Sequence, residues 1–184
     1  NRIKPHTSFR GVFESGLMKM MTIGLGSHRG ATIAHAGGAD SLARLIPAWG
    51  QAILDRAPIL MGLAIVENAY EQTMHVEALR PSEFQSREPQ LLTEAREAMP
   101  RILVQSIDLL VIEEIGKNIS GTGMDTNVVG RMWLPGIKEP TSPGVARIAV
   151  LGLTAETHGN ANGVGLADII TRRPHQAIDF KATY

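Results

Sequence analysis

The chain has 184 residues, of which 43% are hydrophobic, and its 18 Lys and Arg residues balance 18 Asp and Glu residues. This balance leaves no basic field to attract nucleic acid or an anionic membrane, and aromatic residues, at 4%, are too sparse for base stacking. Cysteine is absent, which excludes disulfides, thiolate metal sites and cysteine nucleophiles. No apolar run reaches the roughly 18 residues of a membrane span, and together these features suit a cytoplasmic protein.

Predicted helices and strands alternate along the chain. Apolar residues recur with helical spacing in residues 14–23, 40–54 and 81–99. Apolar or alternating runs predict strands at residues 59–66, 75–79, 108–115 and 145–154.

The continuous apolar runs suit strands that are buried on both faces of a parallel sheet, as ILMGLAIV at residues 59–66 illustrates. Such strands alternating with helices predict an α/β fold of mostly parallel buried strands. We expect the end of one α/β domain in residues 1–57, followed by a second α/β domain in residues 58–184. Residues 1–4 suggest the end of a strand, so we also expect an N-terminal remainder of the same protein as a partner.

Lys19 stands in an otherwise apolar stretch, between Leu17-Met18 and Met20-Met21. In one interpretation it points to water from an amphipathic helix, for which Ser15 is a candidate N-cap. In the other, the amine is desolvated and therefore neutral often enough to form a covalent bond. The sequence leaves both interpretations open.

Three of the six histidines, His6, His28 and His35, fall near glycine or proline in this same part of the chain. A lone histidine is most often structural, but three together point to metal binding or proton transfer. Their spacing matches no zinc motif such as HExxH.

A second candidate loop, EEIGKNISGTGMD at residues 113–125, follows the strongest predicted strand. Sites in open α/β sheets lie at the carboxyl ends of strands, and the glycines here would let backbone N–H groups approach an anion. Lys117 is then a clamp for a carboxylate or a phosphate. The alternative is a plain strand-to-helix turn in which Asp125 is the N-cap.

The segment Ser15-Gly16-Leu17-Met18-Lys19, with His35 sixteen residues after Lys19, resembles the nickel-pincer lactate racemase family. The resemblance implies that Lys19 binds the nickel-pincer nucleotide covalently, with Ser15 and Gly16 beside it, and that His35 ligates the nickel. This cofactor is a nickel pyridinium bisthiocarboxylate mononucleotide.

The resemblance also implies catalytic roles for two further residues. His6 looks like the family's acid/base histidine, although it lies about three residues further from the lysine than in the racemase. Lys117 resembles a substrate- or cofactor-contacting lysine. A second catalytic histidine and a carboxylate-binding arginine of the family fall before this chain begins, so they have no counterpart here.

The function implied is that of an isomerase, a racemase or epimerase that acts on a small 2-hydroxy acid or related hydroxy compound by hydride transfer. The ordinary pKa of histidine then predicts that activity falls below about pH 6.

Two other functions stay open on the sequence alone. One is a metal-dependent hydrolase or lyase that uses His6, His28 and His35 directly. The other is a non-catalytic relative that binds a small molecule.

Overall fold

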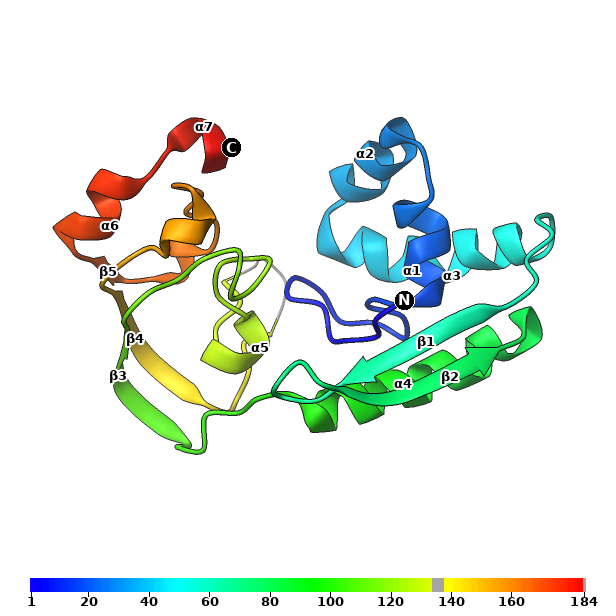
Figure 1. Cartoon of the computed structure of the whole chain (residues 1–184), viewed down its shortest axis with the longest axis horizontal. Coiled ribbons are helices and arrows are strands. Elements are labelled where there is room, and N and C mark those ends of the chain that lie inside the picture. The colour runs from blue at the N-terminus through cyan, green and yellow to red at the C-terminus, as the bar shows by residue number, and fades with distance from the viewer. Residues whose placement is uncertain (134–137, 184) are drawn as a thin grey trace. The chain divides into compact units, whose positions relative to one another are not determined.

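The computed structural model describes residues 1–133 and 138–183, apart from the side chains of Ala39 and Asp40. The chain forms two compact units, Asn1–Pro100 and Arg101–Tyr184 (Figure 1). Helices combine with an antiparallel strand pair in unit 1 and a parallel sheet in unit 2, which confirms the α/β class. The boundary expected after residue 57 does not coincide with this division, because the strand that follows it pairs with the start of the chain.

Unit 1 holds four helices among its described residues, and all three predicted helical segments are found in it. The elements are α1 (Leu17–Lys19), the π-helical turn η1 (Met20–Gly24), α2 (His28–Ala36), α3 (Gly38–Leu54), the 3₁₀ turn η2 (Pro81–Glu83) and α4 (Phe84–Ala98). α2 was not expected as a helix. Its N-cap is Ser27, whose hydroxyl accepts a hydrogen bond from the Gly30 N–H.

The strands of unit 1 form a hairpin in which β1 (Gly62–Glu67) runs antiparallel to β2 (Thr73–Leu79). The expectation of a parallel strand buried on both faces is therefore wrong for β1. Ala64 and Val66 are 1% exposed on the face that packs into the core, whereas Leu63 on the opposite face is 46% exposed. An apolar run of this length looks the same in either arrangement, because the sequence does not reveal its pairing partner.

The start of the chain lies beside β1 as a short parallel extension. The Ile3 N–H donates to the Ile65 carbonyl at 2.8 Å, and the Ile65 N–H donates to the Asn1 carbonyl at 3.0 Å. This confirms strand-like backbone at residues 1–4. The core behind the hairpin joins α1, α3 and α4, and its largest fully buried apolar side chains are Phe9, Phe84, Ile3, Met18, Ile46, Leu91 and Leu92.

Unit 2 is built on a parallel sheet in the order β3 (Ser106–Ile112), β4 (Gly144–Val150) and β5 (Ile169–Ile170). Parallel pairing confirms the expectation for residues 108–115 and 145–154. Burial on both faces is not found for β3, since Leu109 and Val111 are 50% and 53% exposed.

The described helices of unit 2 are all short. They are α5 (Thr126–Val129), the 3₁₀ turns η3 (Ala155–Thr157) and η4 (Val164–Leu166), α6 (Arg172–Ala177) and α7 (Phe180–Thr183). Asp125 is the N-cap of α5, because its side chain accepts from the Asn127 N–H at 2.9 Å. The N-cap interpretation of Asp125 is thus confirmed. Across the described residues of both units, no helix has the length and apolar character needed to cross a membrane.

Arg131 joins three segments of unit 2 through a side chain that is 6% exposed. Its guanidinium donates to the Asp168 carboxylate and to the backbone carbonyls of Leu166, Val145 and Ala146. The bond from Arg131 is the main cause that lowers the pKa of Asp168. Arg131 therefore holds the segment after α5 against β4 and the start of β5.

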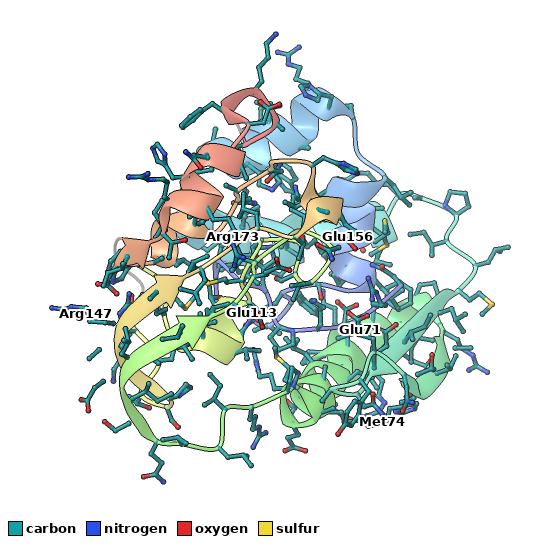
Figure 2. The ribbon with its side chains drawn as sticks, turned by 60° about the vertical axis from the view of Figure 1, so that its left-hand side comes forward. Glu71, Met74, Glu113, Arg147, Glu156 and Arg173 are labelled. Carbon is teal, nitrogen blue, oxygen red and sulfur yellow. The ribbon has the colours of Figure 1, made fainter. Side chains whose placement is uncertain are left out.

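We predict that Arg131→Met lowers the free energy of unfolding by about 2 kcal/mol, because the Asp168 carboxylate and three backbone carbonyls lose a donor that is itself buried. Urea denaturation followed by circular dichroism measures the change. Arg147→Met is the matched control, since the Arg147 side chain projects from β4 (Figure 2) and is 66% exposed, and its Nε lies 3.9 Å from Asp168 Oδ1. Equal and small losses for the two variants would contradict a structural role for Arg131.

Candidate active site

His6 and Lys19 both lie against the ring of Phe9. The His6 and Phe9 ring centroids are 4.4 Å apart, and Lys19 Nζ lies 5.9 Å from the Phe9 centroid. Phe9 itself is 1% exposed. The structure therefore brings together two of the residues that the sequence selected, with a buried aromatic ring as their common neighbour.

Lys19 is half-buried at the last position of α1. Burial lowers the pKa of its amine, because the charged form loses hydration. This favours the desolvated interpretation of Lys19 over that of a lysine directed fully to water. Contact with the face of Phe9 provides some compensation when the amine is protonated.

The helix changes its hydrogen-bonding pattern directly after Lys19, at η1. The Leu25 N–H donates to the Met20 carbonyl at 2.8 Å, and Thr22 Oγ1 donates to the carbonyls of Met18 and Lys19 at 3.0 and 3.2 Å. π-helical turns are rare and occur often at functional sites. Lys19 thus stands at a junction where the backbone departs from regular α-helix.

His6 is held by its own loop. Its ring Nδ1 accepts a hydrogen bond from the Ser8 N–H at 3.0 Å, so the proton of the neutral ring resides on Nε2. Burial lowers the pKa of His6 to about 4, helped by the positive charges of Lys19, Arg10, His35 and Lys4. The lowered pKa places the charging of His6 below the pH of about 6 that an ordinary histidine predicts, and the loss of activity itself stays a prediction.

A buried carboxylate organises the loop that carries His6 and Phe9. Glu14 is 0% exposed, and it accepts from the backbone N–H groups of His6 and Gly11 at 2.9 and 3.0 Å. Arg96 of α4 donates to the same carboxylate at 2.6 Å. Neither Glu14 nor Arg96 was predicted from the sequence. The two residues are 82 positions apart, and no local pattern indicates that they pair.

Ser15 closes the loop rather than capping the helix. Its hydroxyl accepts from the Lys4 N–H at 2.8 Å and donates to the Lys4 carbonyl at 2.5 Å. The expected N-cap role of Ser15 is therefore wrong. The N-cap of α1 is Gly16, which makes no side-chain cap, and the acceptor for the first N–H groups of α1 is Glu88.

His35 lies on α2 with an exposed side chain. Its Nδ1 is 2.7 Å from the Ala31 carbonyl, so Nδ1–H donates and the lone pair of the neutral ring is on Nε2. Such a hydrogen bond orients the imidazole as it does in metal-ligating histidines. With His28 and Thr32, His35 lines an open hollow on this face of α2.

The three-histidine site of the hydrolase alternative is not assembled. His28 and His35 are two turns apart on one helix, about 10 Å along its axis, too far to share an ion. Within residues 1–133 and 138–183, no three His, Asp or Glu side chains are grouped so that they can hold a metal. A single histidine remains sufficient for a metal whose other ligands arrive with a cofactor.

Lys117 belongs to unit 2, whereas His6, Lys19 and His35 belong to unit 1. Its side chain is exposed in the loop after β3, and its N–H donates to Thr157 Oγ1 at 3.2 Å.

Gly123, in the loop that carries Lys117, packs closely against the loop that contains Gly163. A Cβ on Gly123 would lie 1.7 Å from the Asn162 carbonyl oxygen, and one on Gly163 would lie 2.2 Å from the Thr122 carbonyl oxygen. Both glycines have positive φ, 79° and 91°. Close packing of two loops thus accounts for these glycines without an anion.

Comparison with protein-family models, with curated proteins and with solved structures found no match for this chain.

We predict that the His6 ring titrates near pH 4 in NMR spectra of the folded protein, in accord with its lowered pKa. Lys19→Gln removes the neighbouring positive charge that lowers the pKa of His6 most, so this substitution raises the pKa of His6. Arg29→Gln, a change to an exposed residue of α2, leaves the His6 titration unchanged. A wild-type midpoint near the ordinary value of about 6.5 would show that His6 is not desolvated.

Proposed function

We propose that this chain is part of an isomerase that racemises or epimerises a small 2-hydroxy acid or related hydroxy compound, with a nickel-pincer nucleotide attached to Lys19. The observation that carries the proposal is the placement of Lys19, with its lowered pKa, beside His6 on the buried ring of Phe9. An amine and an imidazole with lowered pKa values in one place are typical of catalytic sites.

The residues present fit the cofactor. A lysine with a lowered pKa is neutral more often, which formation of a covalent bond at Nζ requires. The Ala31 carbonyl fixes His35 in the tautomer whose Nε2 can ligate nickel, a metal that imidazole suits. Lys19 would therefore hold the nucleotide and His35 would hold the metal.

When bound, the cofactor supplies the acceptor that takes the hydride from the hydroxyl-bearing carbon and returns it to either face. His6 is proposed to interact with the oxygen that is bonded to the same carbon. Because the Ser8 N–H donates to Nδ1, the proton of the neutral His6 ring is on Nε2, and the role proposed for His6 is to stabilise negative charge on the substrate oxygen.

With its proton on Nε2 and its Nδ1 hydrogen-bonded to Ser8, His6 does not take the proton of the hydroxyl, so we propose that role for another group. The family resemblance supplies a second acid/base histidine ahead of this chain, and we propose it for that role. Lys117, which belongs to unit 2, stays a prediction that rests on the resemblance alone. The composition suits a cytoplasmic location for such an enzyme.

The proposal predicts that Lys19→Ala abolishes covalent adduct, nickel content and isomerase activity in a host that makes the cofactor. Intact mass spectrometry, metal analysis and chiral chromatography of a panel of 2-hydroxy acids provide the three measurements. Nickel and activity that survive in Lys19→Ala would refute it.

His35→Ala separates the metal ligand from the attachment residue. We expect it to retain the adduct on Lys19 and to lose nickel by at least about tenfold, since the imidazole ligand is removed. His28→Ala is the matched control, because His28 lines the same hollow of α2. We expect His28→Ala to retain the adduct, the nickel and the activity.

A further inference from the structure

Glu88 of α4 has a buried carboxylate whose two oxygens differ in their hydrogen bonding. It is 1% exposed, and its Oε2 accepts from the Leu17 and Met18 N–H groups at 3.0 and 3.1 Å. Its Oε1 is buried and has no hydrogen-bond partner among the described residues. Burial raises the pKa of Glu88 to about 7, although the hydrogen bonds from Met18 and Leu17 oppose the rise.

A carboxyl group in this position is costly. Burying an oxygen without a partner is unfavourable, and an apolar residue would fill the same space without that cost. Departures of this kind from good core packing occur where a site requires them. The position of Glu88 therefore calls for a reason other than packing.

The reason lies in the first turn of α1. The opening N–H groups of a helix need acceptors, and Ser15, the nearest candidate in the sequence, is engaged by Lys4. Glu88 takes over this role from a distant helix and satisfies two N–H groups with one oxygen. A carboxylate is also a favourable group at a helix N-terminus.

The absence of a side chain at Gly16 leaves room for this carboxylate. A Cβ at position 16 would lie 2.5 Å from Glu88 Oε1, and Gly16 has φ 128°, a conformation that side chains rarely adopt. Access of Glu88 to α1 thus depends on the glycine that precedes it. This explains physically why glycine follows Ser15 in the segment that leads to Lys19.

We infer that Glu88 is the positioning residue for Lys19: it fixes the first turn of α1 and thereby holds the lysine amine against Phe9. The link is short, since Met18, whose N–H Glu88 binds, is the neighbour of Lys19. The inference rests on the proposed function only in taking Lys19 as the attachment residue.

The test compares Glu88→Met, which keeps the bulk and removes both acceptors, with Glu88→Gln, which keeps one acceptor oxygen. Glu97→Gln is the matched control, as Glu97 is exposed on the same helix. Two measurements are made on the full chain without nickel: amide hydrogen exchange by NMR, and the pH dependence of Lys19 acetylation followed by peptide mass spectrometry.

In Glu88→Met, exchange at the Leu17 and Met18 amides is expected to rise at least about tenfold, while amides inside α3 keep their rates. The pH midpoint for Lys19 acetylation is expected to move up towards that of an ordinary lysine, because a loosened α1 admits water. Glu88→Gln shows smaller changes in the same direction, and Glu97→Gln shows none.

Native exchange at Leu17 and Met18 together with an unchanged acetylation profile would overturn the inference. So would an equal loss of protection in α1 and α3, which indicates a general structural role. If Glu88→Met does not fold, Glu88→Gln decides by the same criteria. Neither measurement involves cofactor or substrate, so this inference and the proposed isomerase can fail separately.

Discussion

The two N–H groups that open α1 have their acceptor in Glu88, and the local geometry of the candidate site follows from this contact. Because the acceptor comes from α4, the direction of α1 is set by packing within unit 1 and not by a local cap. Gly16 lets the carboxylate approach, and Lys19 emerges at the end of the short helix. The π-helical turn then begins at the next residue.

α4 also holds the loop that carries His6 and Phe9. Arg96 donates to Glu14, which in turn accepts the N–H groups of His6 and Gly11. Glu88 and Arg96 stand eight positions apart, a little over two turns of one helix. A single helix therefore fixes the two segments that carry His6 and Lys19.

The electrostatics of the site favour neutral groups. Burial lowers the pKa values of both His6 and Lys19, and the positive charge of Lys19 lowers that of His6 further. The Phe9 ring lies against both side chains without supplying a hydrogen bond. A neutral imidazole with its proton on Nε2 suits hydrogen-bond donation, and an amine with a lowered pKa suits covalent attachment.

Unit 2 obtains its order in a different way. Its parallel strands need long connections, and these are held by one buried cation, Arg131, and by close packing of two glycine-containing loops. Lys117 lies in one of these loops with its backbone bound to Thr157. The loop is thus ordered by its own contacts, which leaves the lysine side chain exposed.

Much of the fold was accessible from the sequence, because it depends on contacts between near neighbours in the chain. Helical spacing located α3 and α4, apolar runs located β3 and β4, and one of the two interpretations of residues 113–125 made Asp125 the N-cap that the structure shows. Residue type and spacing also selected His6 and Lys19, which the structure brings to one aromatic ring.

The tertiary structure decided the pairing of β1, the tautomer of His6 and the cap of α1. An apolar run carries no record of which strand it will pair with, so β1 was expected in a parallel sheet and lies in a hairpin. The tautomer depends on where the Ser8 N–H points, and the cap on a carboxylate seventy positions further along the chain. The cap joins residues that are distant in the chain, so it depends on how the helices pack, which local residue patterns do not encode. The tautomer depends on the exact backbone conformation of a short loop, which residue types alone do not determine.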